Sequence, residues 1–282
     1  MKLVLITGAS TGIGFEAAKF LSQNGFRVLA GVRSDKDFEK LNTINENLSA
    51  IKIDITKKES IDAAFEEVVS DFSPNEYFAL INNAGIVKAA PLEFVELDDL
   101  RWQFEVNVTS QVAVTQKFLP LLRKADEGRI IFTGSNSGVF TVPMNVPYGA
   151  SKYAMEAIAD GFRRELLANS NIKVSLLQPG QIKTPIWNKS LDAAMKAKES
   201  FPPDVDKLYG KIEKSIIGEV VANGKNNAAD PIVVSRAILH ALTSKRPKTR
   251  YSMGVGAFMT QNIFRRLPDK LMDKILRKAL KY

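Results

Sequence analysis

The sequence contains no cysteine, and His240 is the single histidine among its 282 residues. Thiol nucleophiles, disulfides and metal sites built from Cys and His are therefore excluded, and no metal is expected. His240 follows the apolar residues of a predicted helix, where we expect it to have a structural role. No apolar run approaches the length of about 18 residues that a membrane-spanning helix needs.

The first residues, Lys2 to Thr7, already form an apolar run. They leave no room for the charged region, apolar core and cleavage site of a secretory signal, so the expected location is cytoplasmic. A hydrophobic content of 45% is enough for one large core, and no linker-like segment divides the chain. A single α/β domain is therefore expected.

Basic residues are concentrated at one end of the chain. The net charge is +8, whereas residues 241–282 alone carry 11 Lys and Arg against 2 acidic residues. The preceding part of the chain is therefore close to neutral. A nucleic-acid-binding surface needs basic residues that share a face with stacking aromatics, so no nucleic-acid partner is expected.

Short apolar runs alternate with helical patterns along most of the chain. The runs lie near residues 2–7, 27–32, 50–53, 77–81, 129–132, 172–177 and 250–253. This alternation predicts a single Rossmann-type doubly wound α/β domain, with a mostly parallel sheet of about seven strands and helices on both faces. Ligands bind such sheets at the carboxyl ends of the strands.

Three parts of the chain follow from this pattern. Residues 1–255 are expected to form the dinucleotide-binding and catalytic domain. Within it, residues 186–227 make a long polar excursion that is typical of a lid over the site. Residues 256–282 form a basic amphipathic extension.

Three glycines, Gly8, Gly12 and Gly14, follow the first apolar run directly. Glycines at a strand–helix junction allow a tight turn and close approach of a ligand, and the helix start that follows attracts an anion such as pyrophosphate. The spacing departs from the Gly-x-Gly-x-x-Gly fingerprint of dinucleotide folds. A plain strand-to-helix turn is the alternative, but it needs fewer glycines.

Arg33 follows the second run, at the position where NAD-binding domains usually carry an acidic residue for the ribose 2′-hydroxyl. An arginine pairs with a 2′-phosphate, which an acidic residue would repel. This favours NADP(H) over NAD(H). The alternative is that Arg33 is an ordinary exposed charge.

Two further strand ends carry polar residues. Asp54, after the third run, is suited to accept a hydrogen bond from an adenine amino group or to cap the helix that begins near Lys57. The sequence Asn82-Asn83-Ala84-Gly85, after the fourth, is suited to brace the backbone near a ligand or to form an ordinary turn. The sequence leaves these alternatives open.

Tyr148 and Lys152 lie four residues apart at the start of a predicted helix, so both side chains share one face. A nearby cation favours the phenolate, so we expect Lys152 to lower the pKa of Tyr148 and to make it a usable acid or base. Ser135 follows the end of the fifth run. A Tyr-x-x-x-Lys pair alone is common on exposed helix faces and would carry little weight.

Together these motifs resemble those of the classical short-chain dehydrogenase/reductase family over roughly residues 2 to 255. The resemblance rests on Thr7-Gly-Ala-Ser-Thr-Gly-Ile-Gly14, Asn82-Asn-Ala-Gly85, Asn107, Ser135, Tyr148-Gly-Ala-Ser-Lys152 and Pro179-Gly-Gln-Ile-Lys-Thr184. Thr11 departs from the basic residue often found there in NADP-preferring members. The long tail and Arg33 make the chain look closer to the branch acting on retinoids, steroids and related lipids.

The resemblance implies an oxidoreductase that moves a hydride between a nicotinamide and a carbonyl or alcohol substrate, and the likeness to the retinoid and steroid branch implies a lipophilic one. Tyr148 would be the general acid/base, Lys152 would lower its pKa and bind the nicotinamide ribose, Ser135 would bond the substrate oxygen, and Asn107 would hold a relay water. The cofactor residues would be Gly8, Ser10, Thr11, Gly12, Ile13, Gly14, Arg33, Asp54, Ile55, Asn83, Ala84, Gly85, Tyr148, Lys152, Pro179, Gly180, Ile182 and Thr184. The family often forms homo-oligomers. A non-catalytic NADP-binding sensor of the same fold is the alternative function, against which the intact Ser135, Tyr148 and Lys152 argue.

Within residues 262–280, apolar side chains recur at helical spacing beside basic residues. Packing of this helix on its own domain or on a partner subunit is the favoured interpretation. Peripheral contact with an anionic membrane is the alternative.

Overall fold

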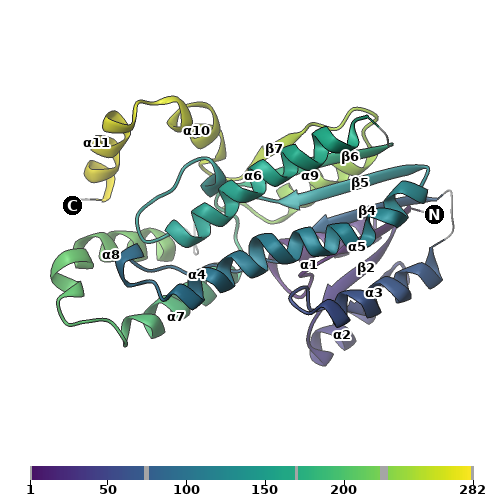
Figure 1. The fold of residues 1–282 in the computed structure, drawn as a ribbon, viewed down its shortest axis with the longest axis horizontal. Helices are drawn as coiled ribbons and strands as arrows, with labels where there is room; N and C mark the ends of the chain where they lie inside the picture. Colours follow the sequence, from purple (N-terminus) through teal and green to yellow (C-terminus); the bar gives the residue numbers. More distant parts are fainter. Residues whose placement is uncertain (1, 73–75, 169–170, 223–227, 281–282) are drawn as a thin grey trace.

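The computed structural model describes residues 2–72, 76–168, 171–222 and 228–280. Its centre is a parallel sheet of seven strands in the order β3-β2-β1-β4-β5-β6-β7. The strands are β1 Lys2–Ile6, β2 Phe26–Val32, β3 Leu48–Lys52, β4 Tyr77–Asn82, β5 Glu127–Thr133, β6 Ile172–Pro179 and β7 Arg250–Met253. The predicted doubly wound fold is confirmed (Figure 1).

Helices cover both faces of the sheet because the strands are apolar on both sides. In β1, Leu3 and Leu5 belong to one buried cluster, whereas Val4 and Ile6 belong to the other. The first cluster takes in α3 Lys58–Asp71, α5 Ser110–Lys124 and α6 Val146–Leu166. The second takes in α1 Gly12–Ser22, α2 Asp35–Asn42 and α9 Ile232–Thr243.

The long helix between β4 and β5 is irregular. It runs as α4 Leu97–Phe104, a π-helical segment Glu105–Thr109 and then α5, which continues beyond Pro120. A π segment inside an α-helix is frequently found at functional sites. Asn107 lies within this segment.

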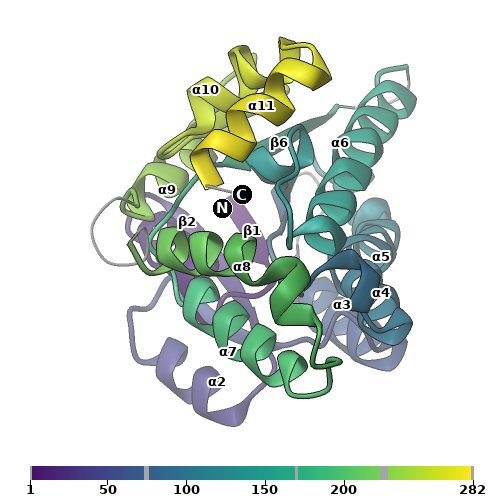
Figure 2. The same cartoon turned by 90° about the vertical axis from the view of Figure 1, so that its left-hand side faces the viewer.

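The excursion after β6 folds as two helices, α7 Ile186–Lys198 and α8 Val205–Ala222. Residues 223–227 of the predicted lid lie outside the described residues. The C-terminal extension comprises α10 Ala257–Asn262, a 3₁₀ turn Phe264–Arg266 and α11 Asp269–Leu280. Figure 2 shows α7, α8, α10 and α11 together at the end of the molecule onto which the strands point. None of the helices in the described ranges is sufficiently long and apolar to cross a bilayer.

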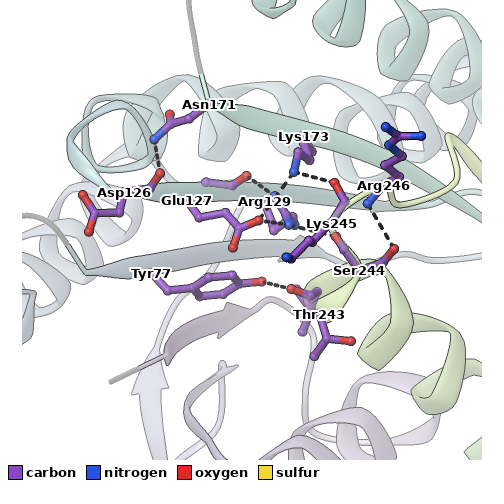
Figure 3. A network of polar contacts seen from close by, with 12 residues as sticks. Tyr77, Asp126, Glu127, Arg129, Asn171, Lys173, Thr243, Ser244, Lys245 and Arg246 are labelled. Atoms are coloured by element: carbon purple, nitrogen blue, oxygen red, sulfur yellow. Dashed lines mark hydrogen bonds and ion pairs between the residues drawn. The ribbon is translucent and has the colours of Figure 1, made fainter.

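A polar network fixes the opposite edge of the sheet, where β4 and β5 begin (Figure 3). The buried guanidinium of Arg129 pairs with Glu127 and donates to the Ser244 carbonyl at 3.1 Å. Tyr77 donates to the Leu242 carbonyl at 2.8 Å, and burial raises the pKa of its hydroxyl. These bonds hold the end of α9 against the sheet.

We expect Glu127→Gln to lower the free energy of unfolding by about 2 kcal/mol, because it leaves a buried guanidinium without its carboxylate. The expected loss is below the range for a fully buried pair since Glu127 is partly exposed. Denaturant unfolding measures it. The exposed Glu39→Gln is the control and should change stability by less than about 0.5 kcal/mol; equal effects of the two variants would contradict the assigned role of the pair.

Candidate active site

The glycine loop after β1 is packed closely against the exit of β4. Gly8 has φ +67°, and a Cβ added to it would lie 2.7 Å from the Ala84 Cα. A Cβ on Gly14 would lie 2.4 Å from both the Asn83 Nδ2 and the Gly8 carbonyl oxygen. Only glycine fits at these two positions, so the structure brings the two predicted cofactor motifs into contact.

Thr7 holds the two motifs together. Its hydroxyl oxygen, fully buried, accepts hydrogen bonds from the backbone N–H of Asn83 at 3.0 Å and of Ala84 at 3.2 Å. The Asn83 side-chain amide donates in return to the carbonyls of Thr7 and Gly8. Of the two roles considered for Asn82-Asn83-Ala84-Gly85, the structure therefore supports bracing of the glycine loop over an ordinary turn.

The N-terminus of α1 points out of this loop. Its N-cap residue, Thr11, is exposed, and its side chain makes no capping hydrogen bond. Helix α1 therefore begins with backbone N–H groups that suit an anion. A Cβ on Gly12, whose φ is +60°, would lie 3.2 Å from the Thr184 Cβ, so the loop after β6 closes over the same helix start.

Four buried polar side chains on the long α4–α5 helix hold the residues that follow β4. They recur every four residues: Gln103, Asn107, Gln111 and Thr115. Gln103 bonds the backbone of Lys88 and Ile86, and Asn107 bonds the backbone of Ile86. Gln111 donates to the Ala84 carbonyl, and Thr115 accepts from the side chain of Asn82. The sequence analysis named only Asn107 of these four residues. The other three could have been recognised from the spacing of four residues between polar side chains, which places them on one face of the helix.

Both N–H groups of the Asn107 side chain donate to protein acceptors. Its Oδ1 accepts from the Ile86 N–H at 2.9 Å, while Nδ2 donates to the Ile86 carbonyl at 3.0 Å and to the Ser151 hydroxyl at 3.1 Å. Ser151 in turn donates to the Tyr148 carbonyl at 2.7 Å. Asn107 therefore links the β4 exit to the first turn of α6.

The three predicted catalytic side chains gather where β5 ends and α6 begins. The Ser135 hydroxyl is placed to hydrogen-bond the Tyr148 oxygen. It also donates to the Asn136 side-chain carbonyl at 3.2 Å and accepts from the Ser137 N–H at 3.1 Å. The Lys152 ammonium, largely buried, lies 5.6 Å from the centre of the Tyr148 ring and donates to the Thr133 carbonyl at 2.7 Å. Pro147 in the first turn sets φ for the helix start that positions this pair.

The expected lowering of the Tyr148 pKa is not what this arrangement gives. Burial raises the pKa of Tyr148, and the Ser135 hydrogen bond only partly opposes it. Burial also lowers the pKa of Lys152 to about 8. The expectation considered charge alone, whereas both groups are placed among atoms of low polarity that disfavour their ionised forms.

Asp54 and Arg33 lie near one another at the ends of β3 and β2. Burial acts to raise the pKa of Asp54, but hydrogen bonds from Thr56 and the charges of Arg33 and Lys57 outweigh it and lower the pKa. Asp54 does not cap α3, because its carboxylate bonds Thr56 and Lys57 is the N-cap residue. Arg33 is exposed at this edge of the sheet.

The loop after β6 is tied to the end of β7. Gly180 donates from its N–H to the Met253 carbonyl at 2.7 Å, and a Cβ on it would lie 2.2 Å from the Val255 carbonyl oxygen. Ile182 is buried, and its carbonyl accepts from the Trp187 indole at 2.7 Å. This anchors α7 beside the site.

An apolar cavity, partly open to solvent, lies between this edge and the excursion helices. Its lining includes Ala90, Met144, Leu191, Phe201 and Ile217. Met144 lies four residues before Tyr148 and is the non-glycine residue with positive φ, +65°, in the described chain; its carbonyl accepts from the Ala90 N–H. The walls of the cavity come from three separate segments of the chain, within residues 89–91, 144 and 190–217.

Comparison with known proteins agrees with this geometry. The model of the short chain dehydrogenase family matches residues 2–194. The NADPH-dependent 3-dehydrocapnine reductase of Ornithobacterium rhinotracheale is 35% identical over 286 residues, which cover 100% of this chain and 98% of the relative. The 17-beta-hydroxysteroid dehydrogenase type 6 of Bos taurus is 33% identical over 283 residues, which cover 99% and 88%. A short-chain dehydrogenase structure from Streptomyces avermitilis has a TM-score of 0.76 at 24% identity, over 100% of this chain and 97% of that one.

The chain belongs to the short-chain dehydrogenase family, as the resemblance implied. It is therefore an oxidoreductase of CH–OH and C=O groups that uses a nicotinamide dinucleotide.

We expect Thr7→Val to lower the free energy of unfolding by about 2 kcal/mol, because two partly buried N–H groups lose their acceptor. Thr7→Ser keeps the hydroxyl and should cost less than about 1 kcal/mol. Nucleotide affinity, measured by calorimetry, should fall roughly tenfold in Thr7→Val and stay unchanged in Thr7→Ser. If Ser and Val weaken nucleotide binding equally, the hydroxyl does not hold the loop.

Proposed function

We propose that the chain catalyses NADPH-linked reduction of a lipophilic carbonyl compound, and the reverse alcohol oxidation, with Tyr148 as general acid/base. The observation that carries this proposal is the gathering of the Ser135 and Tyr148 hydroxyls beside the buried Lys152. The pair lies at the carboxyl edge of the sheet, where the glycine loop and the start of α1 suit the phosphates of a dinucleotide.

The bound nicotinamide supplies the hydride. The chain's own residues handle the oxygen and its proton. As hydride reaches the carbonyl carbon, negative charge grows on the oxygen, and the hydroxyls of Ser135 and Tyr148 are suited to donate hydrogen bonds to it. Tyr148 then gives its proton to that oxygen. In the reverse direction it accepts the alcohol proton.

The raised pKa of Tyr148 supports the reductive direction. A phenol whose pKa lies above its ordinary value keeps its proton at neutral pH and can donate it. The Lys152 ammonium then stabilises the phenolate that remains. Its pKa of about 8 leaves it mostly protonated at neutral pH.

Asn107 acts in this proposal as a positioning residue. Both N–H groups of its side chain donate to protein acceptors, so a relay water would have to be held through a carbonyl oxygen of this residue. Its bonds to Ile86 and Ser151 keep the β4 exit and the Tyr148 helix in register.

NADPH is preferred over NADH in this proposal because Arg33 stands at the end of β2 in place of an acidic residue. The similar reductase from Ornithobacterium rhinotracheale is named as NADPH-dependent, which supports the same choice. Asp54 and Ile55 would border the adenine.

The apolar cavity supports a lipophilic substrate. Its walls are formed mainly by aliphatic and aromatic side chains, including Leu191, Phe201 and Ile216. The ion pair of Lys198 with Glu213, at 2.7 Å, is the charged feature of its lining. A ring system or an alkyl chain fits this chemistry, with the reacting carbonyl directed toward Tyr148.

We expect Tyr148→Phe to lower kcat for carbonyl reduction about a thousandfold while NADPH affinity changes little, because the variant loses only the transferable proton. Tyr153→Phe, on the exposed side of the same helix, is the matched control and should keep its turnover. NADPH absorbance over a panel of ketones and aldehydes measures both. Turnover retained in Tyr148→Phe would refute the role of Tyr148, and tight NADPH binding without turnover of any substrate would favour the non-catalytic sensor.

We expect Arg33→Ala to weaken NADPH binding about tenfold and to leave NADH binding nearly unchanged, because the guanidinium pairs only with the 2′-phosphate. Fluorescence titration of both nucleotides measures the ratio. Arg123→Ala, an exposed cation at the end of α5, serves as the control. Equal losses for the two nucleotides would remove the argument for NADP.

A further inference from the structure

The C-terminal elements expose a set of large apolar side chains, which we call the C-terminal surface. It consists of Phe258 and Met259 in α10, Ile263 after it, and Leu271 and Ile275 in α11. Phe258 is 71% exposed, and Leu271 is 46% exposed. Leu271 and Ile275 lie four residues apart and share one face of α11.

These side chains are not the ones that attach the extension to the domain. Met272 and Leu280 are buried, and the Ser215 hydroxyl of α8 donates to the Leu280 carbonyl at 2.5 Å. The Phe264 ring lies 5.6 Å from that of Phe140. Helix α11 therefore does pack on its own domain, as the favoured interpretation predicted, but through a different side from Leu271 and Ile275.

Basic residues surround the exposed apolar set. Residues 257–280 carry six of them, Arg265, Arg266, Lys270, Lys274, Arg277 and Lys278, against Asp269 and Asp273. All six are exposed, and among the described residues none of the six is seen in an ion pair. The ion pairs that do form lie elsewhere on the molecule. The C-terminal surface therefore combines apolar side chains with uncompensated positive charge.

We propose that the C-terminal surface binds the surface of a membrane that contains anionic lipid. Apolar side chains of an interfacial helix enter the boundary between headgroups and acyl chains, while flanking cations attract anionic headgroups. Helix α11 is strongly amphipathic, with apolar side chains separated from basic ones. No described helix is able to span a membrane. A strongly amphipathic helix of this kind is typical of one that lies in the membrane interface.

Charge disfavours a second copy of this chain as the occupant. In a two-fold dimer the same patch meets itself, so the net positive charge of one copy would face that of the other. Like charges across an interface repel. An anionic lipid surface complements the same charges.

The position of this surface connects it with the candidate substrate cavity. Helix α11 packs on α8, and α7 and α8 supply much of the cavity lining. Figure 2 shows α7, α8, α10 and α11 at one end of the molecule. Membrane docking through α10 and α11 therefore brings the cavity close to the lipid phase, where a lipophilic substrate would be dissolved.

Sedimentation of the full chain with vesicles tests the proposal. The probes are vesicles of phosphatidylcholine and phosphatidylserine in a ratio of about 7:3, and vesicles of phosphatidylcholine alone. We expect binding to the anionic vesicles, weak binding to the neutral ones, and a loss of binding as salt rises from about 0.05 to about 0.5 M. Leu271→Glu/Ile275→Glu and Arg265→Glu/Arg266→Glu should each reduce the partition coefficient at least about tenfold.

Matched controls lie at the opposite edge of the sheet. Leu167→Glu replaces a leucine that is 69% exposed at the end of α6, and Arg123→Glu/Lys124→Glu reverses two adjacent exposed cations at the end of α5. Both controls should bind anionic vesicles as the unchanged protein does, and thermal unfolding shows that each variant is folded.

Three outcomes would overturn the proposal. The first is no sedimentation of the unchanged protein with anionic vesicles at low salt, and the second is equal binding by surface and control variants. The third is a dimer, detected by light scattering, that the Leu271→Glu/Ile275→Glu variant converts to monomers without a change in vesicle binding.

Discussion

The candidate site depends above all on the pairing of buried polar groups around the exit of β4. The backbone there leaves the ladder of the sheet while still partly buried, so its N–H and C=O groups need other partners. Thr7 supplies an acceptor from the neighbouring strand, and Gln103, Asn107 and Gln111 supply partners from one helix. The glycine loop and the start of α6 are each bonded to this same segment, so its geometry sets theirs.

Burial governs the proton chemistry of the site as much as charge does. A nearby ammonium favours a phenolate, whereas removal from water favours the neutral phenol and the neutral amine. In this structure burial dominates, and the Tyr148 hydroxyl keeps its proton. A proton donor held in this state suits a group that must protonate a developing alkoxide.

The two edges of the sheet serve different purposes. Hydrogen bonds and the ion pair of Arg129 hold the start of β5 to the residue after α9. They lie at the edge of the sheet opposite to the candidate site. The carboxyl edge carries the glycine loop, the Ser135–Tyr148–Lys152 group and the apolar cavity. The C-terminal helices lie at the same end of the molecule (Figures 1 and 2). The excursion after β6 and the C-terminal extension therefore add to the edge at which the reaction is expected. The interactions at the other edge stabilise the fold.

The sequence alone determined the fold class, the family and the positions of the strand ends, because alternating apolar runs and glycine spacing are local properties of the chain. The resemblance singled out Asn107, but only the structure shows that its partners are Ile86 and Ser151. Only the tertiary structure decided which way burial shifts the pKa of Tyr148, that Asp54 bonds Thr56 and does not cap α3, and which side of α11 faces outward. These features depend on solvent exclusion and on contacts between segments far apart in the chain, which no local pattern records.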